Sequence, residues 1–462
     1  MFNFSEINEE CGVFGGWCPQ KNIAQYIKCG LLKLQHRGQE SAGISCGNEF
    51  QKIVKNKGLV NLALENSLLK NIEGNFGIGH VRYSTFGDDR KENIQPLKVT
   101  YMGEDVSLVH NGNVAQAKKI REKFERIGEV FLSSSDSEVI LKRLIFSLKK
   151  KPSLWTFEEV GKCLKENFSD GAYCILLYLP NRIMAFRDNF GYRPLMFAKC
   201  EEGYFVASED VAFYGLNVEE LTEIKPAYGV EITKEGYEIK PFAQSKNVCQ
   251  CVFEQIYFAS PASNIFSKNV YETRVKLGKI LFEAADKDFS ADIVIPVMDS
   301  GLGCAIGYSQ ASNIPFHLGL IRNSWMERSF IQPNQEKRTL NVRQKFIPIK
   351  QVIENKKVVL IDDSLVRGTT SREIISMLKC CGAKEVHMRS VSPKIINTCL
   401  WGVDIPTKEE LVSYKKTDKE IAQQIGADSV KFLPLEKLSE VFRGDVWCKK
   451  CFKGVEDEVF LP

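Results

Sequence analysis

The sequence of 462 residues predicts two regions of different fold class, a mixed α+β region followed by an α/β region with a mainly parallel sheet. Residues 11–243 alternate short apolar strands with turn signals and a few helices, whereas from residue 252 the order becomes strand, loop, helix. The polar stretch 244–247 lies between the two patterns and is the candidate boundary. The length allows three domains of ~150 residues or two larger ones.

In the first region, apolar residues at helical spacing predict a helix over residues 23–35. Gly38 follows this helix and is a residue type typical of a C-terminal cap. Three lysines at 149–151, directly before Pro152, predict the solvated end of another helix. Further apolar runs predict strands over residues 173–178, 182–186 and 204–207.

In the second region, apolar runs predict three strands, each separated from the next by a loop and a helix. This alternation indicates a mainly parallel sheet with helices packed against it. The expected elements are strands at 293–296, 358–361 and 386–391, a loop at 298–303 with a helix through Tyr308, and a helix from Thr370. Thr370 and Glu373 have the spacing of a capping box, and Gly382 ends that helix.

Charge and hydropathy exclude several classes of protein. The formal net charge is only +4, which does not favour nucleic acid as a partner. No apolar stretch approaches the ~18–20 residues of a membrane span. The first ten residues are acidic and lack the hydrophobic segment of a secretory signal. We therefore expect a cytoplasmic protein whose 15 scattered cysteines are thiols, nucleophiles or metal ligands.

The strongest chemical signal lies between residues 358 and 370. Asp362 and Asp363 end a predicted strand, where paired carboxylates can hold ribose hydroxyls and a divalent metal. The loop after them is rich in hydroxyls, contains Gly368 and leads into a helix N-terminus, whose amides favour a phosphate. The alternative is a solvated turn whose acids only cap nearby amides. Adjacent acids, a glycine and two threonines before a helix favour the phosphate site.

Cys11 directly follows a ten-residue leader. If the leader is removed, Cys11 carries a free α-amine with a pKa of about 7.7–8.0, which can accept the proton of its own thiol. While the leader remains, the same nitrogen is an amide and cannot act as a base. The alternative is that Cys11 is a small buried residue of a strand.

The 358–370 string resembles the fingerprint for 5-phosphoribosyl-1-pyrophosphate (PRPP) of type I phosphoribosyltransferases. The resemblance assigns Asp362 and Asp363 to ribose and magnesium, and the loop that follows to the 5′-phosphate. It also implies that Ser300 belongs to the segment that completes the metal and pyrophosphate site. The residues implied for PRPP are Asp362, Asp363, Ser364, Val366, Arg367, Gly368, Thr369 and Thr370.

Four N-terminal segments, which begin at His36, Gly79, His110 and Ser134, resemble the glutaminase domain of class II amidotransferases. The residues that this resemblance implies for glutamine and the oxyanion are Arg37, Gly38, Arg82, Asn111, Gly112 and Asp136.

Each of these residues has a chemical use in hydrolysing glutamine. Arg82 can clamp the α-carboxylate, and Asp136 can accept from the α-ammonium group. The Asn111 side chain and the Gly112 amide can stabilise an oxyanion, typically worth ~2.7–4 kcal/mol per donor. Arg37 and Gly38 would complete the pocket wall.

From Cys11 almost to the C-terminus, the chain resembles the amidophosphoribosyltransferase family. The implied reaction hydrolyses glutamine at Cys11 and transfers the ammonia to PRPP, giving 5-phosphoribosylamine, pyrophosphate and glutamate in the first step of purine (IMP) synthesis. The resemblance also implies a four-layer αββα N-terminal-nucleophile domain, a homotetramer, an internal ammonia passage, one Mg²⁺ per subunit and inhibition by purine nucleotides. The implied divisions are 1–10 propeptide, 11–243 glutaminase, 244–251 linker, 252–440 phosphoribosyltransferase and 441–462 tail.

Cys448 and Cys451 form a close pair of the kind that binds metals. Cys251 and Cys399 lie where iron–sulfur members of the family place their other two ligands. On spacing alone, four thiolates suit zinc as well as a [4Fe–4S] cluster, and the resemblance favours a structural cluster. Cys249 could be mistaken for Cys251, and four unrelated thiols are the remaining alternative.

The chain departs from the family pattern at residues 323–330, where Ser324 replaces a positive charge and Glu327 replaces a glycine. The segment 335–345 keeps basic residues that could close over pyrophosphate as a lid. These basic residues are Lys337, Arg338, Arg343 and Lys345.

Four other readings compete with this one. Histidines in the N-terminal motifs (His36, His80 and His110) could serve as the base of a Cys–His nucleophile. A hexosamine-forming amidotransferase would share the glutaminase half but would lack the 358–370 fingerprint. A non-catalytic PRPP sensor would need a DNA-binding module and no maturing cysteine. The fourth alternative is a PRPP- or nucleotide-sensing paralogue with altered or ammonia-only activity.

Overall fold

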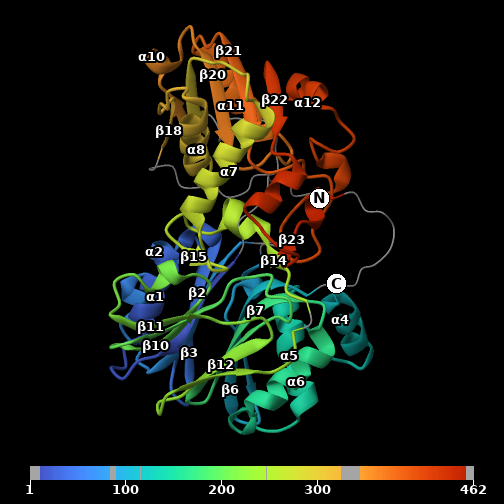
Figure 1. Ribbon diagram of the computed structural model, residues 1–462. Coiled ribbons are helices and arrows are strands. Elements are labelled where there is room, and N and C mark those ends of the chain that lie inside the picture. The colour runs from blue at the N-terminus through green and yellow to red at the C-terminus, as the bar shows by residue number, and fades with distance from the viewer. Residues whose placement is uncertain (1–10, 84–89, 115, 246, 324–343, 454–462) are drawn as a thin grey trace.

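The computed structural model describes residues 11–83, 90–114, 116–245, 247–323 and 344–453. Its first region contains two antiparallel sheets that face each other (Figure 1). One sheet runs in the order β11 (Val218–Glu223), β9 (Met196–Cys200), β10 (Gly203–Ala207), β1 (Gly12–Trp17), β4 (Phe76–Arg82), β2 (Ser41–Gly47), β3 (Gln51–Lys57). The other runs β13 (Tyr237–Pro241), β12 (Tyr228–Ile232), β8 (Arg182–Arg187), β7 (Ala172–Leu179), β6 (Glu104–Asn113), β5 (Leu97–Tyr101).

Three apolar cores make this region a four-layer αββα structure, as the family resemblance implies. Successive residues of a strand point to opposite faces of its sheet, so Val13 packs between the two sheets while Phe14 packs under helix α1 (Ile23–Lys33). In the second sheet, Leu176 joins the core between the sheets, and Leu177 packs against the outer helices. The outer helices are α5 (Asp136–Leu148) and α6 (Phe157–Phe168), with α4 (Ala117–Arg126) beside them (Figure 1).

The second region is built on a wholly parallel sheet in the order β17 (Ile293–Pro296), β20 (Lys357–Asp362), β21 (Glu385–Ser390), β22 (Ser429–Phe432). Val359 packs on the side of α7 (Val270–Ala285) and α8 (Leu302–Ser312). Val358 packs on the side of α11 (Thr369–Cys380) and α12 (Asp418–Ile425). A separate antiparallel pair, β18 (Leu320–Arg322) and β19 (Phe346–Pro348), lies beside the sheet (Figure 1).

The predicted strands are confirmed, but two predicted helix caps are wrong. Helix α1 ends at Lys33, and Gly38 is extended with φ −162°. The backbone of Arg82 passes so close to Gly38 that no side chain fits there: an added Cβ would lie 2.7 Å from the carbonyl carbon of Arg82. Helix α11 begins one residue early, at Thr369, and its N-cap is Gly368 with φ 73°, so no Thr370 capping box forms. Gly382 (φ 90°) does follow the end of α11.

Among the described residues, no helix combines the length and the apolar character that crossing a membrane requires. The shorter helices are α2 (Val60–Ala63), α3 (Asn66–Leu69) and α10 (Lys350–Ile353).

Helices α7 and α8 touch through glycines. An added Cβ at Gly278 would lie 1.9 Å from the carbonyl oxygen of Cys304, and one at Gly307 would lie 1.9 Å from that of Val275. Because α8 leads out of the loop after β17, this contact helps to position that loop.

The first prediction concerns this contact. Replacing a helical glycine with alanine normally stabilises a helix by about 1 kcal/mol. Gly278→Ala should instead destabilise the protein by about 1–3 kcal/mol, because the methyl group forces the helices apart. Urea unfolding measures the change, and the exposed Lys279→Ala on the same helix is the control. An unchanged or higher midpoint for Gly278→Ala would contradict the packing.

Candidate functional site

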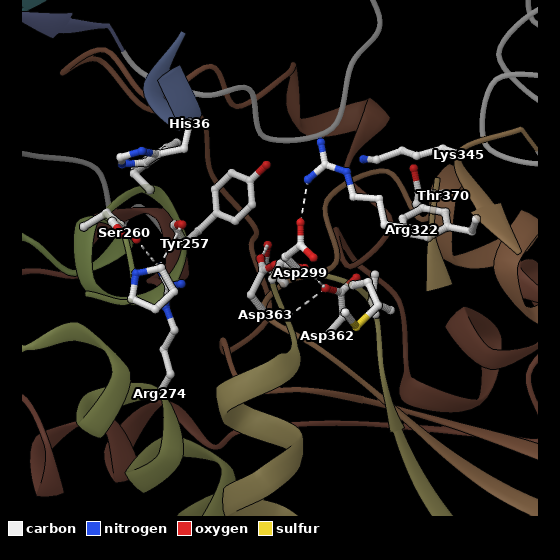
Figure 2. A pocket seen from close by; sticks show the side chains of 18 of the residues that line it. His36, Tyr257, Ser260, Arg274, Asp299, Arg322, Lys345, Asp362, Asp363 and Thr370 are labelled. Atoms are coloured by element: carbon white, nitrogen blue, oxygen red, sulfur yellow. Dashed lines mark hydrogen bonds and ion pairs between the residues drawn. The ribbon is translucent and has the colours of Figure 1, made fainter. Parts of the chain in front are cut away.

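A cavity of about 380 Å³ opens at the carboxyl end of the parallel sheet. Acids and bases share its wall, and Figure 2 shows Asp299, Asp362 and Asp363 between the cationic side chains of Arg274 and Arg322. The lining residues are His36, Gln39, Tyr257, Phe258, Ala259, Ser260, Pro261, Arg274, Val297, Met298, Asp299, Ser300, Arg322, Lys345, Phe346, Asp362, Asp363, Ser364, Val366 and Thr370. Two of them, His36 and Gln39, come from the first region.

The carboxylate pair lies at the end of β20 and is largely buried. Ser300 Oγ donates to Asp362 Oδ1 at 2.8 Å, and the Asp363 amide donates to the same oxygen at 2.9 Å. Burial raises the pKa of Asp363, although hydrogen bonds from Ser364 and Ser300 oppose this shift. The structure therefore brings together Asp362, Asp363 and Ser300, the three residues that the resemblance implies for magnesium. Their oxygen atoms are donors of the kind that Mg²⁺ prefers.

The loop after the pair only partly lines the cavity. Ser364, Val366 and Thr370 lie on its wall, whereas Arg367, Gly368 and Thr369 do not. The Arg367 guanidinium turns to Glu410, with Nε to Oε2 at 3.0 Å.

Two further arginines shape the cavity. Arg322 Nη1 donates to Asp299 Oδ2 at 2.5 Å. Buried Arg274 donates to the carbonyl oxygens of the 255–259 turn, at 3.0 Å to Gln255, 2.9 Å to Tyr257 and 2.8 Å to Ala259. Arg274 thus holds the turn that forms one wall of the cavity.

Cys11 lies at one end of β1, in the first region. Gly12 pairs with Val81, so Cys11 and Arg82 lie at the same end of the β1–β4 pair. Cys11 Sγ lies 3.4 Å from the carbonyl oxygen of Tyr83, and Gly38 packs on the backbone of Arg82. The structure therefore brings together Cys11, Gly38 and Arg82.

Asn111 and Gly112 lie near the end of β6, in the facing sheet. His80 on β4, two residues before Arg82, contacts the His110 carbonyl oxygen at 3.2 Å and so ties the two sheets together here. The Asn111 Nδ2 atom is buried and has no hydrogen-bond partner among the described residues. An amide donor in that position is ready for a ligand oxygen.

Asp136 is buried at the start of α5 and supports the turn after β6. Its Oδ2 accepts from the Val114 amide at 3.1 Å, and its Oδ1 lies 3.6 Å from His110 Nδ1. Burial raises its pKa, but His110 and the Val114 amide outweigh this effect and hold the pKa below its usual value. Asp136 is therefore a carboxylate at neutral pH.

The three histidines of the Cys–His alternative have other partners. His36 Nε2 lies 2.8 Å from Glu209, and His110 Nδ1 lies 3.3 Å from Ser137 Oγ. His80 is fully buried, and burial together with the neighbouring Arg82 lowers its pKa to about 3. These contacts favour the α-amine over an imidazole as the base for Cys11.

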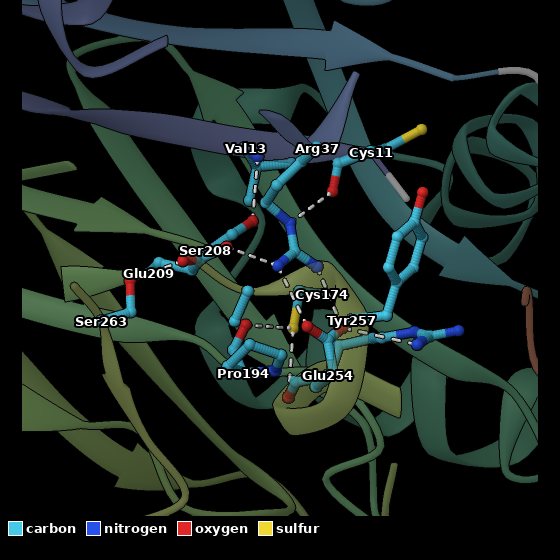
Figure 3. A network of polar contacts seen from close by, with 12 residues as sticks. Cys11, Val13, Arg37, Cys174, Pro194, Ser208, Glu209, Glu254, Tyr257 and Ser263 are labelled. Atoms are coloured by element: carbon cyan, nitrogen blue, oxygen red, sulfur yellow. Dashed lines mark hydrogen bonds and ion pairs between the residues drawn. The ribbon is translucent and has the colours of Figure 1, made fainter. Parts of the chain in front are cut away.

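Arg37 is fully buried between the two regions (Figure 3). Its Nη1 donates to Glu209 at 2.6 Å and to Glu254 at 3.0 Å, and its Nη2 donates to Glu254 at 2.9 Å. Its Nε donates to the carbonyl oxygen of Cys11 at 3.1 Å. Arg37 therefore binds the backbone of Cys11 and two buried carboxylates. Its guanidinium does not form the wall of a glutamine pocket, although the resemblance implied that it would.

The four candidate ligand cysteines come from three separate segments that meet near the C-terminal end of the described chain. The parallel pair β14 (Gln250–Cys251) and β23 (Trp447–Cys448) aligns Cys251 with Cys448. Burial raises the pKa of Cys451, and charges at Cys448, Cys251 and Cys399 raise it further, as expected for neighbouring thiols.

Their arrangement is not that of a finished metal site. Among the described residues, no three or more His, Cys, Asp or Glu side chains are arranged to hold a metal ion. All fifteen cysteines are free thiols.

Several predicted features lie outside the described residues. These are the leader 1–10, Ser324, Glu327 and, from the proposed lid, Lys337, Arg338 and Arg343. Lys345 is described and lines the cavity.

Comparisons with known proteins identify the family of this chain. A family model described as a glutamine amidotransferase domain matches residues 80–215. The amidophosphoribosyltransferase of Methanocaldococcus jannaschii is 40% identical over 462 residues, covering 96% of this chain and 97% of that protein. The chain belongs to the amidophosphoribosyltransferase family. The Bacillus subtilis member is 40% identical over 94% of this chain and 89% of its own length.

Two solved structures have the same fold as this chain. The Bacillus subtilis glutamine PRPP amidotransferase, complexed with ADP and GMP, superposes with a TM-score of 0.86 at 38% identity, over 96% of this chain and 97% of that one. A structure described as the allosteric regulatory enzyme of purine biosynthesis gives a TM-score of 0.87 at 38% identity, over 96% of both chains.

The enzyme is therefore a glutamine amidotransferase and pentosyltransferase. It forms 5-phosphoribosylamine from glutamine and PRPP in the first step of purine biosynthesis. Nothing in the comparisons supports a sensing or ammonia-only paralogue. The family assignment also rules out the alternative hypothesis of a hexosamine-forming amidotransferase.

The sequence did not reveal the buried charged residues that surround Arg37 in this amidophosphoribosyltransferase. Glu209, Glu254 and Arg193 are buried and meet around Arg37, although Glu209 and Glu254 lie 172 and 217 residues from it in sequence. A lone Glu or Arg has no local pattern that announces burial. Arg193 follows Tyr192 and Glu254 follows Phe253, but Glu209 lies between Ser208 and Asp210, so the three share no local sequence signal.

The second prediction concerns Glu209. Burial raises the pKa of this carboxyl, but His36 and Arg37 outweigh that effect and hold the pKa well below its ordinary value of 4.5. Glu209→Gln should cost about 3–5 kcal/mol at pH 7, because it leaves Arg37 partly uncompensated. The depressed folded-state pKa stabilises the protein above pH ~4.5, and this stability is lost as the pH falls below it.

The difference between wild type and Glu209→Gln should therefore shrink between about pH 5 and pH 3, which thermal unfolding at several pH values measures. Glu231→Gln is the control, since Glu231 is a half-buried partner of Arg182 at 3.2 Å and should cost under about 1 kcal/mol. A constant difference across this pH range would contradict the assignment.

Proposed function

We propose that catalysis runs through two sites, one around Cys11 and one around Asp362 and Asp363, within domains at 11–243 and 252–440. The proposal rests on the residues that line the cavity, which come from both regions. Residues of the parallel-sheet region hold its carboxylate pair, while His36 and Gln39 reach it from the glutaminase region. Ammonia released near Cys11 would then travel to PRPP inside the protein, as the family resemblance implies.

At the first site, removal of residues 1–10 frees the α-amine of Cys11. The amine takes the thiol proton, and the thiolate attacks the carboxamide carbon of glutamine. The Asn111 Nδ2 atom, which has no partner among the described residues, and the Gly112 amide receive the oxyanion. The protonated amine returns its proton to the leaving ammonia, and water then hydrolyses the thioester to glutamate.

Charged groups on two elements would orient the substrate glutamine. Arg82, at the end of β4, binds the α-carboxylate, and Asp136, ionised at neutral pH, accepts from the α-ammonium group. Gly38 keeps the wall beside Arg82 free of side-chain atoms.

At the second site, Asp362 and Asp363 bind the ribose hydroxyls, and the loop through Thr370 binds the 5′-phosphate. Ser300 and the two carboxylates offer the oxygen donors that suit one Mg²⁺, which supplies positive charge to the pyrophosphate when bound. Ammonia attacks C1 of PRPP, the C1–oxygen bond breaks, and pyrophosphate leaves. Arg322 and Lys345 stand on the cavity wall where they can receive that charge.

Cys251, Cys399, Cys448 and Cys451 are the thiols that we assign to a structural [4Fe–4S] cluster. Their chemistry fits the group, since four thiols from three segments lie near one another and the Trp401 amide donates to Cys399 Sγ at 3.3 Å. Cys249, which also contacts Cys448, is not a ligand in this assignment.

The inhibitors and the oligomeric state that we propose are those that the family resemblance implies. The Bacillus subtilis relative was solved with ADP and GMP, which supports purine nucleotides as inhibitors of this enzyme. We also propose a homotetramer that works in the cytoplasm, a reducing compartment in which cysteines remain outside disulfides, as all fifteen do here.

The third prediction tests the first site. Cys11→Ala should lower glutamine-supported pyrophosphate release by at least about a thousandfold, because the nucleophile is lost. Turnover with ammonium chloride should stay within about twofold of wild type, since ammonia reaches PRPP without Cys11. Glutamate and pyrophosphate release are measured together under anaerobic conditions, and N-terminal sequencing of the wild type should begin at Cys11. Retained glutamine turnover, or a retained leader in the active wild type, would refute the mechanism.

The fourth prediction tests the thiol site. Anaerobically purified enzyme should contain about four iron and four sulfide per chain, and Cys251→Ser should lose most of both. Cys249→Ser is the matched control and should retain them. One zinc per chain, or loss of iron in the Cys249 variant alone, would contradict the assignment.

A further inference from the structure

Glu254 is linked through two arginines to both halves of the proposed glutamine site, the Cys11 backbone and the strand of Gly112, although it lies outside that site. It lies in the turn of helix η5 (Glu254–Phe258), which belongs to the second region and also carries Tyr257 on the wall of the PRPP cavity. Its side chain is fully buried. Two arginines of the first region, Arg37 and Arg193, meet at its Oε1 atom, at 2.9 and 3.4 Å.

The first connection leads to the nucleophile. Glu254 accepts from both terminal nitrogens of Arg37, which fixes the plane of the guanidinium. Held in that plane, Arg37 donates its Nε to the carbonyl oxygen of Cys11 at 3.1 Å (Figure 3). This carbonyl belongs to the residue that bears both the thiol and the amine, so Glu254 sets the orientation of the Cys11 backbone.

The second connection leads to the oxyanion strand. Arg193 donates its Nη2 to the carbonyl oxygen of Trp401 at 2.6 Å, and the Trp401 ring stacks on Tyr192 with centroids 5.4 Å apart. The same loop is bound to the end of β6, because Asn113 Nδ2 donates to the Leu400 carbonyl oxygen at 2.8 Å.

The loop also lies directly against the oxyanion residue Gly112. Gly402 has φ +98°, and an added Cβ there would come within 3.2 Å of the Gly112 carbonyl carbon. The position of the Trp401–Gly402 loop therefore limits where the Gly112 backbone can lie.

We infer that Glu254 is a positioning residue for glutamine hydrolysis, which holds the Cys11 backbone through Arg37 and the Gly112 strand through Arg193 and the Trp401 loop. The inference rests on the proposed roles of Cys11 and Gly112. Tyr257 lies in the same short helix, but Arg274 holds that turn, so a change at Glu254 should leave the PRPP side nearly unaltered. A carboxylate is required, since one oxygen serves two cations.

The test is Glu254→Gln, which keeps the shape and removes the charge. We expect the kcat for glutamine hydrolysis to fall at least tenfold, with ammonia-supported pyrophosphate release and the KM for PRPP within twofold of wild type. Alkylation of Cys11 by a diazoketone analogue of glutamine, which needs the same nucleophile and pocket, should slow by a similar factor.

Asp210→Asn is the matched control. Asp210 is also a buried carboxylate that joins the two regions, through the Asn264 amide at 3.0 Å, but it has no contact with Arg37 or Arg193. Its glutamine kinetics should stay within twofold of wild type. Arg193→Gln removes only the Trp401 connection and should also lower the glutamine kcat, and the double variant should be no worse than Glu254→Gln alone.

A folded Glu254→Gln enzyme with wild-type glutamine kinetics would overturn the inference, as would a parallel fall of the glutamine and ammonia activities. If Glu254→Gln does not fold, Arg193→Gln decides, and wild-type glutamine kinetics in that variant would overturn the inference. Cys11→Ala is measured beside them. Glutamine turnover in Cys11→Ala would refute the proposed nucleophile, whereas loss of turnover there with no effect at Glu254 would refute the positioning role alone.

Discussion

The buried ion pairs around Arg37 are the interaction on which the arrangement of this enzyme depends. A guanidinium with no exposed surface is held between Glu209 of one region and Glu254 of the other. Burying these charges is costly unless each is paired with good geometry, so the two regions can associate in few relative positions. The same network reaches the carbonyl oxygen of Cys11 and includes Glu254 of the turn that lines the cavity. Association of the two regions therefore also determines where Cys11 and this turn lie.

The two sites use different means to reach a defined geometry. The cavity that we assign to PRPP follows from the topology of a parallel sheet, whose carboxyl-end loops meet at one edge and bring Ser300 beside Asp362. The glutamine site instead depends on two facing sheets, and it is assembled from strand ends joined by contacts such as that between His80 and the His110 carbonyl. One site is local to a few consecutive loops, and the other is distributed over the whole first region.

This difference explains how much the sequence could predict. The strands at 293–296 and 358–361 and the acids after them were predictable, because periodicity and a short motif carry the information. The four-layer arrangement and the residues proposed to bind substrate glutamine were predicted only from the resemblance to a family. The caps at Gly38 and Thr370 were predicted wrongly, because a close approach to Arg82 and a left-handed Gly368 override local preference. The partners of Arg37 could not be predicted, since nothing local to Glu209 or Glu254 indicates a contact about 200 residues away.

The pairing of β14 with β23 has a consequence for how the chain matures. Strand β14 comes before the parallel sheet and β23 comes after it, and the two are parallel neighbours. On the ribosome, β14 must remain an open edge until the whole intervening region has been synthesised. This short ladder, and with it the contact between the segments of Cys251 and Cys448, therefore cannot form before the whole parallel-sheet region has been synthesised.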